Sequence, residues 1–145
     1  MLKEDHKRIK ALFRKYESAG ERAYKEKQTT AEKAFQELEV HSKLEEEIFY
    51  PAVQARADEE GKNLVREGIE EHHVVDTLIN ELKGLDPEDE RYDAKFKVLT
   101  ENVEHHIEEE EGELLPDAER LLEPHLDRLG ADMEQRKEQL IATLA

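Results

Sequence analysis

Apolar residues recur every three or four positions along most of the chain, which is the spacing that places them on one face of an α-helix. Alternating patterns typical of β-strands are few, and Gly and Pro are almost absent from the long periodic segments. The pattern therefore predicts an all-α protein with four core helices and a further helix at the C-terminus.

Turn-forming and capping residues indicate where these helices begin and end. The first helix is expected to run from about Leu2 into the region of Tyr24, and Thr29 and Thr30 indicate the start of the second. The remaining segments are a linker at 58–63, a third helix over about 65–82, a fourth from about 88 to 114 and a fifth from 124 to the C-terminus. The fifth helix is expected to cap or flank a bundle formed by the others.

Histidine and glutamate take the place of apolar residues at several positions of the predicted core faces. These positions are His6, His41, Glu45, His72, His106 and Glu110. A carboxylate that is buried without a partner costs several kcal/mol, so buried glutamates are rare unless they are paired or bound to metal. Six converging polar groups call for a cation, and metal binding would then be coupled to folding.

The six positions form a pattern that occurs twice. The first copy contains His6, His41, Glu45 and Pro51, and the second contains His72, His106, Glu110 and Pro116. In both copies the second histidine precedes its glutamate by four residues and its proline by ten. Residues four apart share one face of a helix, so each His-x-x-x-Glu pair can bind one ligand together. Four imidazoles and two carboxylates predict a site for two iron or manganese ions inside the bundle.

Register decides between adjacent histidines, because neighbouring residues on a helix diverge by roughly 100°. His72 is favoured over His73 because it shares a stripe with the apolar residues that follow it. His106 is favoured over His105 because it lies four residues before Glu110 and ten before Pro116, on the stripe of Phe96, Leu99 and Val103. His125 is off the pattern and, like His73 and His105, is expected to be solvated.

Three further residues lie close to the predicted ligands. Tyr50 lies roughly 180° around an ideal helix from His41, so it is expected to serve in packing. Glu37 and Asp76 lie one helical turn from predicted ligands and are expected to orient imidazole N–H groups.

Composition limits the remaining possibilities. A chain of 145 residues is one domain, and its 38 acidic against 22 basic residues give a net charge of −16, which argues against nucleic acid and membrane partners. The chain has no cysteine, which excludes disulfides, iron–sulfur clusters and thiolate zinc sites. No segment has the length and hydropathy of a membrane span or a signal peptide, so a cytoplasmic protein is expected.

The ligand set also favours particular metals. Zinc usually takes four ligands, and calcium and magnesium do not select imidazoles, so iron is preferred and manganese comes next. The order His-x-x-x-Glu differs from the Glu-x-x-His pairs of ferritin-like proteins.

The order of these residues resembles the hemerythrin-like, or HHE cation-binding, domain over about residues 1–123. The resemblance implies one domain over 1–145, with an antiparallel up-down-up-down four-helix bundle at about 1–123 and a flanking helix at about 124–145. It implies two non-haem irons with an oxo or hydroxo bridge. By this match His6, His41, His72 and His106 would be terminal ligands, and Glu45 and Glu110 would bridge the irons.

Two departures separate the chain from the oxygen-carrying hemerythrins that it resembles. Those proteins have a fifth histidine on the third helix, where this chain has Gly68 or Asp76. Their last motif resembles His-x-x-x-x-Asp, whereas this chain has His-x-x-x-Glu. The pattern is closer to bacterial HHE proteins linked to iron handling and to nitric oxide or peroxide stress, which argues against reversible oxygen carriage.

The expected function is that of a di-iron protein that binds or reacts with a small oxidant, namely oxygen, nitric oxide or hydrogen peroxide, as a sensor, scavenger or stress-response protein. The alternative is an iron store or donor for the repair of iron centres, without turnover. A metal-free helical interaction module is a third interpretation. The sequence does not decide whether the protein is an enzyme. It does not decide the oligomeric state either, for which a monomer is the simplest expectation.

Overall fold

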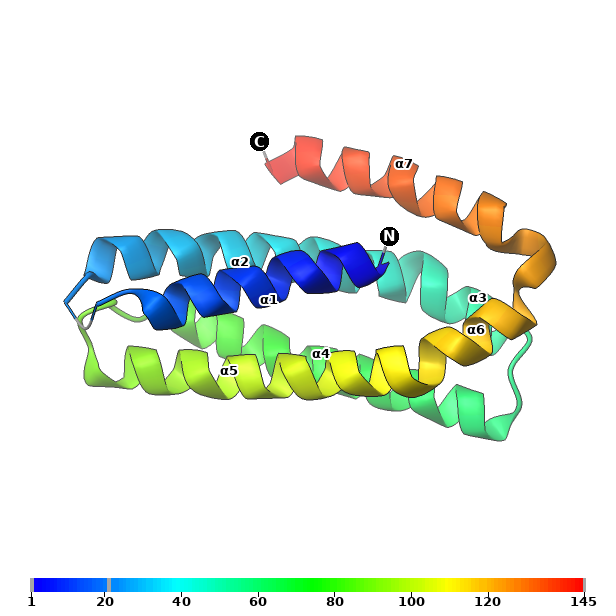
Figure 1. Cartoon of the computed structure of the whole chain (residues 1–145), viewed down its shortest axis with the longest axis horizontal. Coiled ribbons are helices and arrows are strands. Elements are labelled where there is room, and N and C mark those ends of the chain that lie inside the picture. The colour runs from blue at the N-terminus through cyan, green and yellow to red at the C-terminus, as the bar shows by residue number, and fades with distance from the viewer. Residues whose placement is uncertain (1, 21, 145) are drawn as a thin grey trace.

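The structure is a computed structural model that describes residues 2–20 and 22–144, most of which are helical (Figure 1). The α-helices are α1 (Leu2–Ser18), α2 (Tyr24–Leu44), α3 (Tyr50–Gln54), α4 (Glu59–Lys83), α5 (Glu90–Glu109), α6 (Leu115–Leu121) and α7 (Leu126–Leu144). Two π-helical turns, η1 (Glu45–Phe49) and η2 (Glu110–Leu114), and one 3-10 turn, η3 (Glu123–His125), complete the described part of the chain. The prediction of an all-α protein is therefore confirmed.

Four long helices form an antiparallel up-down-up-down bundle, as predicted (Figure 1). α1 packs mainly against α2, and α4 against α5. The turn η1 joins α2 to α3 in one continuous rod, and η2 joins α5 to α6 in a second. α7 runs back along the outside of α2 and contacts it and η1, so the C-terminal helix flanks the bundle.

The apolar core consists of two clusters separated by a polar layer. One cluster extends toward the α1–α2 and α4–α5 connections and includes Ile9, Leu38, Val75 and Val103. The other, toward α3 and α6, includes Leu2, Leu44, Val65 and Leu114. On α1 and α4 a histidine lies between the residues of the two clusters, and His41 and His106 lie close to the boundary between the clusters near the ends of α2 and α5. The polar positions therefore form one layer across the middle of the bundle.

The boundary between the first two helices differs from the prediction. α1 ends at Ser18 and α2 begins at Tyr24, so the first helix stops before the region of Tyr24. Thr29 does not mark a helix start, because its hydroxyl donates to the carbonyl of Lys25 inside α2 at 2.9 Å. A threonine that bonds to a carbonyl one turn back is compatible with a helix interior.

The predicted linker at 58–63 is also shorter than expected. α4 begins at Glu59, and the carboxylate of Asp58 accepts a hydrogen bond from the backbone N–H of Gly61 at 2.9 Å. Asp58 is thus the N-cap of α4, and the acidic and glycine residues that suggested a linker form its first turn. No described helix is both long and apolar enough to cross a lipid bilayer.

We predict that Phe96→Ala lowers the free energy of unfolding by about 3–5 kcal/mol, the usual cost of truncating a buried phenylalanine. Phe96 is 1% exposed and lies 3.8 Å, between ring centroids, from Tyr16. Urea unfolding measures the change. Val98→Ala is the matched control on the same helix, because Val98 is 45% exposed and its truncation should stay within about 0.5 kcal/mol of the parent protein. Equal effects of the two substitutions would contradict this description of the core.

Candidate metal centre

Two π-helical turns begin at the two buried glutamates. The N–H of Tyr50 donates to the carbonyl of Glu45, and the N–H of Leu115 donates to the carbonyl of Glu110, each five residues back. Such turns are rare and are concentrated at functional sites. Each one adds a residue to the helical turn and so changes which side chains face the bundle interior beyond it.

A proline explains the position of each wide turn. Pro51 and Pro116 follow the turns and have no N–H to donate into an ordinary α-helical turn. The ring of a proline also crowds the carbonyl four residues back, here that of Glu47 or Gly112. A wider turn relieves this crowding, so the two prolines of the repeat place the backbone irregularity beside the glutamates.

The first group of inward-facing side chains contains His6, His41, Glu45 and Glu110, all of them buried. The Nε2 atoms of His6 and His41 lie 3.2 Å apart. Glu110 Oε1 lies 3.2 Å from the Nε2 of His6, and Glu45 Oε1 lies 3.3 Å from the Nε2 of His41. Four potential ligand atoms therefore converge on one point.

The second group contains Glu45, His72 and His106. Glu45 Oε1 lies 3.1 Å from the Nε2 of His72 and 3.6 Å from that of His106. Glu110 also reaches this group, because its Oε2 lies 3.0 Å from the Nε2 of His106. Both glutamates thus contact histidines of both groups, and the structure brings together all six residues that the sequence pattern singled out.

The other histidines lie elsewhere. The side chains of His73 and His105 are 65% and 64% exposed, and His125 is exposed as well. The register argument from the sequence therefore selected the buried member of each adjacent pair.

Each inward imidazole has a carboxylate behind it. The Nδ1 atom faces Glu111 in His6 (2.7 Å), Asp5 in His41 (3.0 Å), Glu46 in His72 (3.5 Å) and Glu71 in His106 (3.0 Å). A carboxylate that accepts from Nδ1 holds the proton there and turns the Nε2 lone pair toward the centre, as in many metal sites. The Nδ1 of His72 is the exception, since it makes no hydrogen bond with the described residues.

These carboxylates are not the ones that were expected. Glu37 faces Arg8, at 3.6 Å between Oε1 and Nε, and Asp76 is exposed, so the prediction for both was wrong. The carboxylates that face the imidazoles come from neighbouring helices, whereas Glu37 and Asp76 lie on the same helices as the histidines they were expected to contact. The repeat did contain a signal, because these acids either precede a lone histidine or follow a ligand glutamate in both copies.

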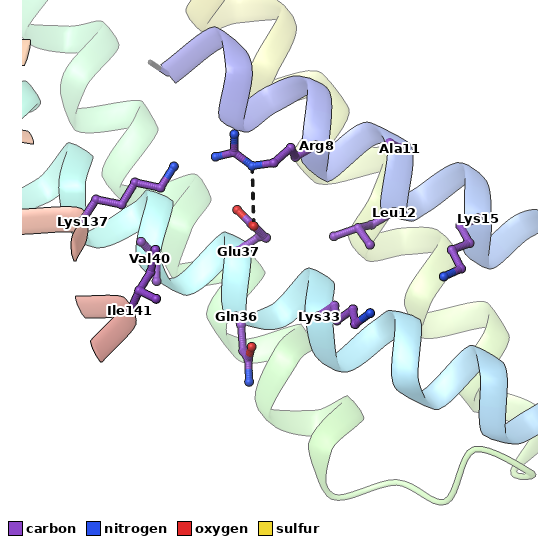
Figure 2. Close-up of a pocket in the computed structure, with 10 residues that line it drawn as sticks. All are labelled: Arg8, Ala11, Leu12, Lys15, Lys33, Gln36, Glu37, Val40, Lys137 and Ile141. Atoms are coloured by element: carbon purple, nitrogen blue, oxygen red, sulfur yellow. Dashed lines mark ion pairs between the residues drawn. The ribbon is translucent and has the colours of Figure 1, made fainter. Parts of the chain in front are cut away.

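Asp5 links the centre to the protein surface. Its Oδ2 faces His41, while its Oδ1 accepts from Arg8 and, at 2.8 Å, from Lys137 of α7. Figure 2 shows Arg8 and Lys137 at a surface pocket of about 570 Å³ between α1, α2 and α7. None of the six inward residues lines this pocket, so the pocket gives no direct access to the centre.

Tyr50 faces the centre, contrary to the prediction that it serves only in packing. Its hydroxyl donates to Glu110 Oε2 at 3.1 Å and lies 3.5 Å from the Nε2 of His72 and 3.4 Å from that of His106. The prediction assumed an ideal helix, and the residue added by η1 rotates the chain by roughly 100° before Tyr50 is reached.

The absence of a side chain at Gly68 makes room for this hydroxyl. A Cβ atom at Gly68 would lie 2.7 Å from the Tyr50 oxygen, which is closer than such contacts normally allow. Gly68 lies one turn before His72. It is one of the two positions where the oxygen-carrying hemerythrins would have their fifth histidine. In this chain the tyrosine hydroxyl fills that space.

The electrostatic environment of the layer favours positive charge. Burial alone would lower the pKa of His41, but the Glu45 carboxylate and a hydrogen bond with Asp5 raise it well above its ordinary value. Burial also opposes protonation of His106, yet hydrogen bonds with Glu110 and two further carboxylates raise its pKa to about 12. Burial alone would raise the pKa of Glu45, but His41 and other partners hold it well below its ordinary value.

The residues fit a cation. Glu45 Oε2 and Glu110 Oε1 are buried and accept no hydrogen bond within the described part of the chain. Leaving a buried polar atom unsatisfied costs about 1–3 kcal/mol, and more for a charged group. Four imidazole nitrogens and two carboxylates are the ligands that iron and manganese accept, and a bound cation would replace the protons that the carboxylates otherwise draw to the histidines.

Comparison with known proteins agrees with this geometry. The family model described as the hemerythrin HHE cation binding domain matches residues 1–118, which include all six inward side chains. The chain belongs to the hemerythrin HHE family.

Relatives of this HHE chain occur in bacteria and fungi. Rv2633c of Mycobacterium tuberculosis is 28% identical over 142 residues, covering 97% of this chain and 84% of that protein. The hemerythrin-like protein C869.06c of Schizosaccharomyces pombe is 26% identical over 122 residues, covering 84% of this chain and 57% of that protein. The crystal structure of an HHE domain-containing Rv2633c homolog from Mycobacterium kansasii superposes with a TM-score of 0.83 at 26% identity, over 98% of this chain and 85% of that one.

We predict that the metal-free protein loses stability as the pH rises from 6.5 to about 9. The pKa of His106 is raised from 6.5 to about 12 in the folded protein. Protonation of His106 therefore contributes fully to the free energy of unfolding below pH 6.5, and this contribution is lost as the pH rises toward about 12. The slope approaches about 1.4 kcal/mol per pH unit for each imidazole that stays protonated. Urea unfolding in the presence of EDTA measures it.

His106→Gln removes one of the titrating groups and should reduce this slope, whereas His73→Ala, at an exposed histidine, should leave it unchanged. A free energy of unfolding that is independent of pH over this range would contradict the electrostatic account.

Proposed function

We propose that the protein holds two iron ions between its six inward side chains and that this centre binds or reacts with oxygen, nitric oxide or hydrogen peroxide. The two converging groups of ligand atoms and the glutamates that contact both of them support two ions rather than one. An iron pair supplies ferrous and ferric states and an open position for a small ligand.

The nature of the ligands favours iron over other metals. Imidazole nitrogen combined with carboxylate oxygen suits iron and manganese, whereas a structural zinc ion is satisfied by four ligands. His6 and His41 would hold one ion, and His72 and His106 the other. Glu45 and Glu110 would contact both.

One observation carries the proposal for a small ligand. A cavity of about 20 Å³ lies against all four inward imidazoles, and its remaining lining is largely aliphatic, with Ile9 and Val75 among the residues. This volume is about that of a sphere the size of one water molecule. The cavity therefore suits a diatomic molecule or a peroxide and excludes larger organic substrates.

Tyr50 would supply a proton donor on the other side of the layer. Burial, together with the charges of Glu45 and Glu110, raises the pKa of Tyr50, so its hydroxyl keeps its proton at physiological pH. Because this neutral hydroxyl donates to Glu110 Oε2 beside the second group of ligands, it can supply a proton to a reduced product through Glu110.

We predict that purified protein contains about two iron ions per chain and that Glu45→Ala or His106→Ala lowers iron content and thermal stability together. Elemental analysis and thermal unfolding measure the two properties. His73→Ala and His125→Ala are the controls, and both should leave iron content and stability unchanged. A protein without transition metal, whose melting temperature does not respond to ferrous salt, would overturn the proposal.

We predict that Tyr50→Phe retains the iron and the fold but slows the reaction of the reduced protein with peroxide by about a hundredfold, the usual effect of removing one aligned donor. Stopped-flow spectra with oxygen, nitric oxide and peroxide measure the rates. Phe49→Leu, at the neighbouring apolar position, is the control. Iron release to a chelator, without any reaction with these three oxidants, would instead support the role of iron donor.

A further inference from the structure

A third group of potential metal ligands lies at the surface beside the centre. This outer cluster consists of Glu71 on α4 and of His105 and Glu109 on α5, whose ligand atoms lie within 4.8 Å of one another. The Nε2 of His105 lies 2.9 Å from Glu109 Oε1. The two residues repeat the His-x-x-x-Glu spacing of the buried pair one position earlier along α5, so they face outward where His106 and Glu110 face inward.

The outer cluster is joined to the buried layer through Glu71. Its Oε1 lies 3.0 Å from the Nδ1 of His106, so one carboxylate belongs to the surface cluster and contacts a buried imidazole. A small cavity of about 10 Å³ continues from Glu71 and Glu109 to Glu110 and Tyr50. Glu110 is 2% exposed, and its Oε1 accepts no hydrogen bond from the described residues. This passage, lined by three carboxylates together with Leu64 and Leu114, therefore links the outer cluster to the buried layer.

The other half of the repeat has apolar residues at the corresponding positions. Val40 and Leu44 occupy the positions of His105 and Glu109 there, and both are buried in the apolar cluster that includes Met133 and Leu140 of α7. α7 thus covers one half of the layer and leaves the other half uncovered (Figure 1).

The two halves of the repeat also differ in how their outer carboxylates are paired. Asp5, the counterpart of Glu71, is neutralised by Arg8 and Lys137. Glu71 and Glu109, by contrast, form ion pairs only with histidines in the described part of the chain. The open side of the layer therefore keeps its negative charge, which attracts cations from solution.

We propose that Glu71, His105 and Glu109 form an outer cation site that captures divalent metal ions and passes them along this passage to the buried centre. This inference rests on the proposed metal centre. An exposed imidazole and two partly exposed carboxylates suit transient binding of a ferrous or similar ion. Glu71 is the transfer ligand, because it contacts both the outer cluster and His106.

The test compares the rates at which metal-free proteins take up cobalt(II), used as a stable divalent probe. Protein and cobalt are mixed, excess EDTA is added after set intervals, and the cobalt that remains with the protein is measured, so only buried ions are counted. The double variant His105→Ala/Glu109→Gln removes the outer site and leaves Glu71 in contact with His106. Circular dichroism confirms that each variant is folded.

The matched control is His73→Ala/Glu70→Gln. This pair also lies on the surface, with His73 65% and Glu70 77% exposed in their side chains and 3.4 Å between them, and its loss changes the net charge equally. Neither residue lines the passage.

At low cobalt concentration the outer-site variant should load about tenfold more slowly than the parent protein and the control, in line with the usual effect of local charge on association rates. All three should reach the same final content of about two ions. The loading rate of the parent should also saturate with cobalt, because a binding step precedes transfer, while that of the variant should rise linearly.

Equal loading rates for the variant and the control would overturn the outer site and leave the buried centre standing. A parent protein that retains no cobalt after EDTA would overturn both proposals together.

Discussion

The structure depends on balancing negative charge inside the core. Two glutamates lie in a layer between two apolar clusters, and each of the four imidazoles around them faces another carboxylate at its outer nitrogen. Such a layer is stable only if protons or cations supply positive charge within it. The raised pKa values of His41 and His106 express this demand, because in the metal-free protein the buried carboxylates favour the protonated form of these two imidazoles. The same demand makes the bundle a metal site, since a divalent ion replaces those protons and gives the carboxylates a partner.

The internal repeat explains most of what the sequence could predict. The period of three to four residues identifies the helices, and the doubled pattern together with the apolar stripes selects His72 over His73 and His106 over His105. The carboxylates behind the imidazoles were missed because their contacts cross between helices. Asp5 faces His41, and Glu71 faces His106 in the equivalent place of the second half. Periodicity along one helix carries no information on such contacts, although the matching positions of the two acids in the repeat do.

Tyr50 marks the limit of arguments from ideal helices. Its predicted position opposite His41 follows from 100° per residue, and a single π-helical turn makes that angle wrong. The proline that follows the turn was visible in the sequence, but a proline can end, bend or widen a helix, and the choice depends on tertiary packing. Here the space above Gly68 accommodates the tyrosine hydroxyl, so the packing of α3 on α4 is compatible with the wider turn.

The two halves of the repeat differ where access to the layer is concerned. Leu115 is the counterpart of Tyr50, and Val40 is the counterpart of His105, so the polar member of each pair lies on the same side of the layer. That side has a small cavity lined by the carboxylates of Glu71, Glu109 and Glu110 together with two leucines, whereas the cavity against the four imidazoles is lined otherwise largely by aliphatic groups. An ion pays a high desolvation cost in an aliphatic cavity and a much smaller one beside carboxylates, while a neutral diatomic molecule shows the opposite preference. The cavity beside the carboxylates is therefore suited to cations, and the aliphatic cavity is suited to neutral ligands. This difference exists although the repeat arranges the six inward side chains in matching pairs.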